Sequence, residues 1–507
     1  MLSGSTVWII FLTYMAALLG LGFYANWKEK NRSAKDYFTA GGQINWFVLV
    51  MTYVAALMST WVFFAGPGGY YRGGLTFFLS ELSYIPLYPI IMYFVMNKVW
   101  LLNTQRGYTT PADLYDDRFR SPALRVILGL LFFFVSLPYV SSIFIACAKA
   151  AQVASGGAVS YNAVIIVVGI GTLIFVSVGG MKSVAWADTA QGWLFIIALW
   201  AIGISALSVG FGGSVTNLVS AVWQSTPSWF SYPGPNEWVP YAARLGYPLS
   251  CAIGWTIMLP HVFIRSGYSG ENLKSQQRLQ YLVPILQTVV WTGVMFIGLL
   301  AVGLVPGLSG SDTELIIPYL INTVVASQGA GFAQVLMTLF ILGALAVGLS
   351  TANGFLLVSG SIISHDILGK TFKLQADPKK QMLISRIVIV VLGLACMWIA
   401  MDPPELIWTL IMFAIAMVMP IFPILICAIY WKRATAPAAV IASVAGIITV
   451  LLTYKLGFGG NWYGFFGMVV AAVLMFVVSL MTKPTDDKVL DEFYGSLKKA
   501  EKIHYVD

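Results

Sequence analysis

Three side chains that carry oxygen stand inside apolar stretches of this sequence. Asp188 lies at the start of one apolar run, and Ser350 and Thr351 lie in the middle of another. A carboxylate in such surroundings is costly unless it is paired, hydrated or bound to a cation. Hard cations such as sodium take carboxylate, hydroxyl and carbonyl oxygens. These side chains predict a sodium cage if a broken helix frees carbonyls nearby, although Ser and Thr in helices often bond their own backbone instead.

Two apolar runs contain residues that could break a helix and free such carbonyls. The first contains the run 65–69, Ala-Gly-Pro-Gly-Gly, and the second contains Gly254-Trp255 and then Pro260-His261. Because glycine leaves the backbone free and proline lacks an N–H, we expect residues 65–69 to unwind. Paired interruptions in matching positions of two halves indicate the binding site of an inverted-repeat transporter. The alternative is the general abundance of Gly and Pro in membrane helices.

The elements that position these residues are predicted to be membrane-spanning helices. The chain is 58% hydrophobic and 10% charged, whereas soluble domains carry about 25% charged residues. Apolar runs of roughly 20 residues can cross a bilayer core of about 30 Å. We predict an all-α membrane domain over 1–482 and a short polar tail over 483–507. The thirteen predicted spans are 6–27, 44–70, 75–96, 122–152, 161–180, 186–209, 240–264, 279–305, 332–368, 384–401, 405–430, 434–454 and 461–482.

The distribution of Lys and Arg predicts how these spans are oriented, because cytoplasmic loops are enriched in both. With the N-terminus outside, the inner loops hold most of the 29 basic residues, and Arg265 is counted among them. The outer side holds Arg72, Arg244 and Lys455. We therefore predict a multi-pass protein of the plasma (inner) membrane, with an extracellular or periplasmic N-terminus and a cytoplasmic C-terminus. The net charge of +8 then reflects topology and does not predict nucleic-acid binding.

Several other functions are disfavoured by what the sequence contains. No G-x-x-x-x-G-K-[ST] motif is present, so ATP-driven pumping is not expected. The four cysteines lie apart in apolar stretches and, with three histidines, predict no thiol or histidine metal cluster. The tail is too short for a signalling kinase. We expect a transporter and not an enzyme.

The sequence resembles the sodium/solute symporter family, which includes proline, pantothenate, monocarboxylate, sugar and sialic acid carriers. The resemblance implies a LeuT-like fold. That fold has a five-plus-five inverted repeat, here about 44–209 and 240–430, with one extra N-terminal and two extra C-terminal helices. The motifs that carry the resemblance are Asp36-Tyr37-Phe38-Thr39-Ala40-Gly41-Gly42, Thr110-Pro111-Ala112-Asp113-Leu114 with Arg118-Phe119, Gly179-Gly180, Trp186-Ala187-Asp188-Thr189-Ala190-Gln191-Gly192, Pro260-His261 with Arg265, Ser350-Thr351, and Asp366-Ile367-Leu368.

The resemblance also implies the ligands of a coupling sodium ion. Their side chains would be Ser350, Thr351 and Asp188, where Asp188 either binds the ion directly or stands behind the ligands and helps sodium leave. Backbone carbonyls would complete the set. The residues that the resemblance assigns to them are Ala55, Met58 and Val347.

The transported solute is less closely defined by the sequence. Proline carriers of this family have an acidic residue where this chain has Leu57, and other motifs resemble the pantothenate and monocarboxylate branch. We therefore expect a small carboxylate, with an amino acid or a sugar as the alternative. A proton-coupled or facilitative carrier and a membrane solute sensor are further alternatives. A monomer would suffice for function, and an oligomer is possible.

Residues near the two interrupted spans are candidates for binding this solute. Lys149 would attract an anion, or would instead extend to the outer interface. Glu81 is either an acid of the site or paired with another helix. The remaining candidates are Tyr53, Ser59, Thr60, Trp61, Phe64 and Trp255.

Overall fold

The computed structural model describes residues 1–28, 33–235, 249–374, 377–404, 407–458 and 463–504. Within these ranges all regular structure is helical, apart from an isolated bridge between Ile44 and Gly270. The α-helices are α1 (Gly4–Lys28), α2 (Ala34–Thr39), α3 (Trp46–Leu57), α4 (Ala65–Leu82), α5 (Leu87–Ile91), α6 (Asn97–Arg106), α7 (Pro111–Phe119), α8 (Pro122–Ala154), α9 (Tyr161–Phe211), α10 (Val215–Ser225), α12 (Pro260–Gly267), α13 (Leu273–Leu304), α14 (Ile316–Thr323), α15 (Ala330–Ser361), α16 (Pro378–Met401), α17 (Ile407–Val418), α18 (Ile421–Tyr430), α19 (Ala436–Lys455), α20 (Tyr463–Met481) and α21 (Asp487–His504).

Shorter helical segments of other types join these helices. The π-helices are η3 (Met92–Met96), η5 (Ser250–Met258) and η8 (Ile362–Thr371). The 3₁₀ helices are η1 (Ala40–Gly42), η2 (Thr60–Val62), η4 (Pro227–Phe230), η6 (Gly310–Leu315) and η7 (Val325–Gln328).

Nine helices among the described residues are long and apolar enough to cross a membrane. One of them, α9, covers two predicted spans. The chain turns within it at Gly180, whose φ of +71° is a left-handed conformation that glycine adopts without strain. A side chain there would also meet the Tyr37 ring at 2.8 Å. The total of thirteen spans stays a prediction, and residues 240–248 of the seventh predicted span lie outside the described ranges.

The first interrupted helix breaks earlier than the sequence analysis expected. Helix α3 ends at Leu57, Met58 and Ser59 are extended, and α4 begins at Ala65. The expected unwinding of residues 65–69 is therefore wrong, because these residues form the first turn of α4. The first N–H groups of a helix have no partner within it, so Pro67 removes no helical hydrogen bond there.

The second interrupted helix breaks where the sequence predicted. The π-helix η5 ends at Met258, and Leu259 has extended dihedral angles of φ −62° and ψ 131°. Pro260 then occupies the first position of α12, where its fixed φ suits a helix start. Both broken helices expose backbone carbonyls inside the protein.

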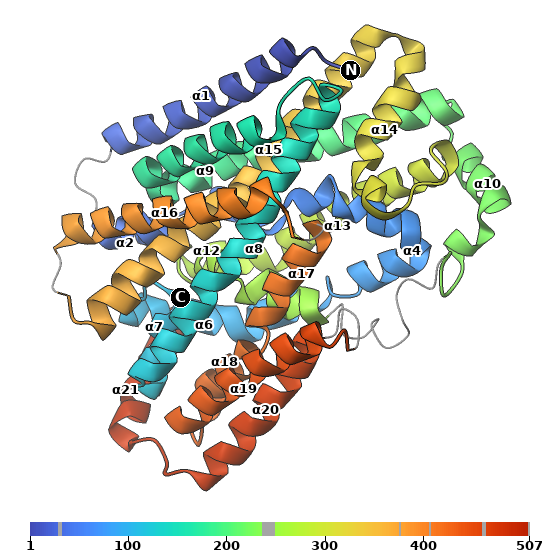
Figure 1. Cartoon of the computed structure of the whole chain (residues 1–507). Coiled ribbons are helices and arrows are strands. Elements are labelled where there is room, and N and C mark those ends of the chain that lie inside the picture. The colour runs from blue at the N-terminus through green and yellow to red at the C-terminus, as the bar shows by residue number, and fades with distance from the viewer. Residues whose placement is uncertain (29–32, 236–248, 375–376, 405–406, 459–462, 505–507) are drawn as a thin grey trace.

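Helix packing places the two breaks beside α15. Helix α15 runs along α9 and α8, α1 covers α9, and α19 and α20 form a pair at one edge (Figure 1). The tail is predicted only as a short polar segment, but it contains the amphipathic helix α21. That helix packs on α6 through a buried face. The face consists of Leu490, Phe493, Leu497 and Ala500.

Candidate functional site

The break after α3 and the middle of α15 meet in a compact cluster of oxygen atoms. The Ser350 hydroxyl donates to the Ala55 carbonyl at 2.7 Å and to the Val347 carbonyl at 3.0 Å. The Thr351 hydroxyl lies 3.1 Å from the Met58 carbonyl and 3.3 Å from that of Val347. These contacts link two hydroxyls and three carbonyls into one group, in which the Val347 carbonyl lies near both hydroxyls. All five residues were assigned to the cage from the sequence, and we call these five oxygens the oxygen cage.

Close backbone packing lets α15 reach the broken helix. A side chain at Gly348 would meet the Thr60 side chain at 2.9 Å, so glycine is required for this approach. The carbonyl of Ala56, between two cage carbonyls, accepts from the Thr351 hydroxyl at 3.2 Å and faces His261 Nε2 at 3.1 Å. His261 thus satisfies one freed carbonyl of α3 from the second broken helix. The two breaks are joined at the oxygen cage.

A buried ion pair lies one helical turn away from the oxygen cage. Arg265 Nη2 donates to Asp188 Oδ2 at 2.8 Å, and both side chains are fully buried. The Thr52 hydroxyl donates to the same oxygen at 2.6 Å and accepts from Arg265 Nε at 2.9 Å. The expectation that Arg265 lies in an inner loop is wrong. Its charge is neutralised inside the fold, and a side chain at Gly354 would meet its guanidinium at 2.7 Å.

Asp188 approaches the oxygen cage without joining it. The hydrogen bonds of the described residues link its Oδ2 to Thr52 and Arg265, while its Oδ1 is buried without a partner. Thr52 precedes Ala55 by three residues on α3. Thr52 therefore connects the carboxylate to the helix that supplies the cage carbonyls. Thr52 was not among the residues predicted from the sequence. Its hydroxyl, one turn before the cage carbonyl of Ala55 in an apolar run, was the feature that could have identified it.

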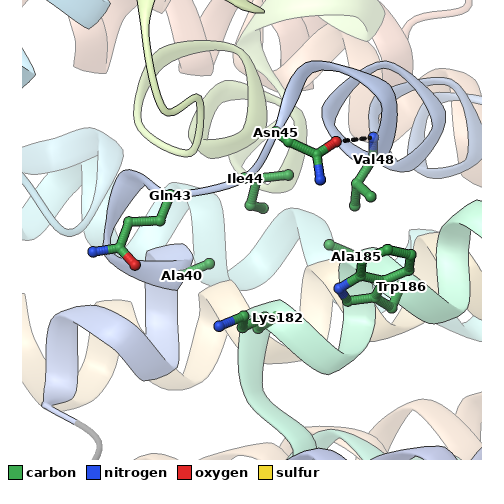
Figure 2. Close-up of a pocket in the computed structure, with 8 residues that line it drawn as sticks. All are labelled: Ala40, Gln43, Ile44, Asn45, Val48, Lys182, Ala185 and Trp186. Atoms are coloured by element: carbon green, nitrogen blue, oxygen red, sulfur yellow. Dashed lines mark hydrogen bonds between the residues drawn. The ribbon is translucent and has the colours of Figure 1, made fainter.

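A small pocket opens beside the buried ion pair (Figure 2). Its volume is about 130 Å³, and it lies between the start of α3 and α9. Val48 on one wall is one turn from Thr52, and Ala185 on the other is one turn from Asp188. Asn45 caps α3 here by accepting from the Val48 N–H at 3.1 Å. The eight lining residues are Ala40, Gln43, Ile44, Asn45, Val48, Lys182, Ala185 and Trp186.

Two of the candidate solute residues meet in a buried group of aromatic rings. Trp61, between the two halves of the first broken helix, lies 6.5 Å from Trp255 in η5 by ring centroids. Three further rings, which the sequence analysis missed, pack around Trp61 at 4.8–6.1 Å. We call the five rings the aromatic cluster; its members are Trp61, Phe77, Trp255, Trp291 and Trp408.

Buried polar donors lie beside the aromatic cluster. The Thr60 hydroxyl is buried and has no hydrogen-bonding partner within the described part of the chain. The Tyr139 hydroxyl and the Trp255 indole N–H are also buried, and neither makes a hydrogen bond of good geometry there. Tyr139 lies close to both Ser59 and Trp255. Buried donors are normally satisfied, so this group is suited to a polar ligand. Tyr139 was missed because it stands in a long apolar helix without a local signal.

The remaining candidates lie elsewhere. The Tyr53 hydroxyl donates to the Thr256 carbonyl and so joins the two broken helices. The Phe64 ring packs against Phe340 at 5.8 Å. Lys149 forms an ion pair of 2.9 Å with Glu314 in η6, which the sequence analysis did not identify. Glu81 lies in α4, and the structure describes its backbone only.

Comparison with known proteins places the chain in a family. The model of the sodium:solute symporter family matches residues 37–446. The chain is 24% identical over 452 residues to the sodium/pantothenate symporter of Haemophilus influenzae, covering 89% of this chain and 90% of that protein. The family match spans most of the sequence, including the oxygen cage and the aromatic cluster.

Solved structures share the fold. A sodium-coupled sialic acid symporter in a substrate-bound outward-open state matches with a TM-score of 0.78, 21% identity and coverage of 95% of this chain and 98% of that chain. Mhp1, a nucleobase-cation-symport-1 family transporter, matches in a closed conformation with a TM-score of 0.54, 13% identity and coverage of 91% and 98%. These likenesses show a LeuT-like fold. The chain therefore belongs to the sodium:solute symporter family, as a transporter that couples the movement of a small solute to sodium.

Proposed function

We propose that the coupling sodium ion binds in the oxygen cage. The observation that carries this proposal is the contact of two hydroxyls with three carbonyls, from a broken helix and the facing helix α15. A hydroxyl has lone pairs as well as a proton. Rotation about the Ser350 and Thr351 C–O bonds would therefore turn the present hydrogen bonds into ion ligands.

Asp188 acts in this proposal from behind the ligands. Its Oδ1 has no hydrogen-bonding partner among the described residues and so keeps lone pairs that a cation can use, while Oδ2 pairs with Arg265. The pocket between Lys182 and Asn45 begins one turn further along the same helices. We infer that sodium leaves the cage past Asp188 toward this pocket. With the N-terminus outside the plasma membrane, this pocket faces the cytoplasm.

The solute in this proposal is a small carboxylate. Ser59, Thr60, Tyr139 and Trp255 offer neutral donors beside the aromatic cluster, and three of them lack a hydrogen bond of good geometry among the described residues. Hydrogen bonds to a charged acceptor are stronger than those between neutral groups. The two related symporters carry pantothenate and sialic acid, which are both carboxylates. An amino acid carries the same group, whereas a neutral sugar does not.

A thermal-shift screen of the purified protein would test the solute class. The ligands are pantothenate, lactate, sialic acid, proline and glucose, each with sodium and with potassium. We expect a carboxylate to raise the melting temperature in sodium only, and its amide to lose the effect. Stabilisation by glucose alone would overturn the carboxylate proposal.

Uptake into proteoliposomes would then test coupling and the donors. We expect the stabilising carboxylate to accumulate under an imposed sodium gradient and not under a proton gradient. Tyr139→Phe should weaken its apparent affinity roughly tenfold, because a hydrogen bond to a charged group contributes about 1.5–3 kcal/mol. The control is Tyr494→Phe. It removes a hydroxyl of the remote tail helix α21 that donates to the Ala428 carbonyl. Equal affinities in both variants would contradict the assigned donors.

A further inference from the structure

We propose that Asp113, His365 and Asp366 form a binding site for a divalent transition-metal ion, separate from the oxygen cage. The three residues lie where α7 meets the π-helix η8 at the end of α15. One ligand-type atom from each lies within 4.8 Å of those from the other two. The set contains one imidazole and two carboxylates, which zinc, cobalt and related ions accept.

Two of the ligands are held in place by the start of α7. Asp113 is the third residue of that helix, and its Oδ2 accepts from the backbone N–H of Thr109 at 2.8 Å and of Thr110 at 3.2 Å. The Thr110 hydroxyl donates to Asp366 Oδ1 at 2.9 Å. One helix cap therefore fixes both carboxylates, and ligand sites need this kind of fixed orientation.

The second oxygen of Asp366 is the observation that most favours a cation at this cluster. The side chain of Asp366 is fully buried, and its Oδ2 has no hydrogen-bonding partner within the described residues. A buried, unsatisfied carboxylate oxygen is costly and requires a proton or a cation. A second carboxylate, that of Asp113, lies beside it and adds to the requirement. This observation is independent of the clustering of ligand types.

His365 completes the set from the accessible side. Its Nε2 lies 3.1 Å from Asp113 Oδ2 and 3.2 Å from Oδ1. Tetrahedral zinc with bonds of about 2.0–2.1 Å places its ligand atoms roughly 3.3 Å apart, so this pair already has a suitable spacing. The other ring nitrogen lies 3.3 Å from the Gln381 amide. In this arrangement the amide nitrogen donates to Nδ1, so Nε2 carries the ring proton that faces Asp113. Metal binding through Nε2 requires the amide to turn over, so that its oxygen accepts from Nδ1–H as the second partner of a metal-binding histidine does.

Lys370 pairs with one of the proposed ligands in the present structure. Its ammonium lies 2.5 Å from Asp113 Oδ1. The Lys370 side chain is 39% exposed and can withdraw into solvent. A cavity of about 340 Å³ opens beside Asp113, His365 and Lys370, so an ion can approach these residues from solvent. Asp366 is fully buried behind them and does not line the cavity.

The metal would connect two segments that belong to different parts of the transport domain. Asp113 lies in the connection between α6 and α8, whereas His365 and Asp366 continue the helix that carries Ser350 and Thr351. A bound ion would restrain the end of α15 against α7. We expect metal bound here to slow transport without changing the ligands of sodium.

Titration of the purified full-length protein with Co²⁺ would test the site, with visible absorption reporting coordination and Zn²⁺ added as competitor. We expect one Co²⁺ per chain, displaced by Zn²⁺. His365→Gln and Asp366→Asn should weaken binding by roughly 10-fold or more, as loss of metal-site partners does. Lys370→Ala should instead tighten binding, because a competing cation is removed. The control is Asp116→Asn, an acid of the same cavity outside the set.

Two results would overturn the proposal. One is equal Co²⁺ affinity in wild type and His365→Gln, a partly exposed position where misfolding is not expected. The other is weaker binding in Lys370→Ala, which would make the lysine a structural partner and leave a proton on Asp366. Sodium dependence of uptake in metal-free buffer should be the same in His365→Gln and wild type, so this test is separate from that of the oxygen cage.

Discussion

The Ser350 hydroxyl donates to the Ala55 carbonyl at 2.7 Å, although the two residues are 295 positions apart in the sequence. The carbonyl is free to accept because α3 ends at Leu57. The hydroxyl reaches it because α15 passes the break without a side chain at Gly348. One interrupted helix and one uninterrupted helix therefore create a site that neither could form alone.

Removing one cage hydroxyl should weaken sodium coupling. Loss of a residue that only hydrogen-bonds to a metal ligand lowers metal affinity by roughly 10- to 100-fold. Ser350→Ala and Thr351→Ala each remove a ligand itself, so each should raise the half-saturating sodium concentration by roughly 10-fold or more. Solute uptake at varied sodium measures this value. Ser361→Ala is the control, because among the described residues that buried hydroxyl on α15 bonds only the Val358 carbonyl of its own helix. Unchanged sodium dependence in both variants would rule out the assigned cage.

Separating Arg265 from Asp188 should destabilise the protein strongly. Arg265→Met leaves the buried carboxylate without its cation, and breaking a buried pair costs about 3–5 kcal/mol. Asp188→Asn combined with Arg265→Met should recover much of the loss, since no uncompensated charge remains. Thermal unfolding in nanodiscs of both single variants and the double variant completes the cycle. Additive losses would show that the pair is not coupled.

Breaking the Lys149–Glu314 pair should loosen the loop that contains η6. The pair connects α8 to this loop, and its partial exposure limits its contribution to about 1 kcal/mol. Hydrogen exchange in residues 310–323 should therefore become roughly fivefold faster in Glu314→Gln. Asp312→Asn, an exposed acid of the same loop, provides the comparison. If exchange changes equally in both variants, the pair does not hold the loop.

The tail helix should contribute measurably to stability. Phe493 is fully buried between α21 and its neighbours, and Phe→Ala substitutions in packed cores cost about 3–5 kcal/mol. We expect Phe493→Ala to lower the melting temperature and Ser496→Ala, at a half-buried position whose hydroxyl bonds only its own helix among the described residues, to leave it unchanged. The ion pair of 3.0 Å between Arg120 and Glu492 is exposed and should matter little. A melting temperature unchanged by Phe493→Ala would mean that the helix does not dock in solution.

The sequence predicted the parts of the site that depend on local pattern. Apolar runs indicated membrane helices, and Pro260 marked the second break, because a missing N–H limits where a helix can continue. Pro67 was misleading, since the same residue is harmless in a first turn. The sequence could not show that Arg265 turns inward to Asp188. That pairing depends on how distant helices meet, and no spacing along the chain encodes it.

Gly354 and Arg265 have a consequence for how relatives of this chain can vary. A side chain at position 354 would overlap the guanidinium, with a nearest approach of 2.7 Å. The arginine in turn is retained only where an acid at position 188 compensates its charge. Substitutions at these three positions should therefore arise together during evolution. In a related sequence that has a small neutral residue in place of Arg265, a larger residue can replace Gly354.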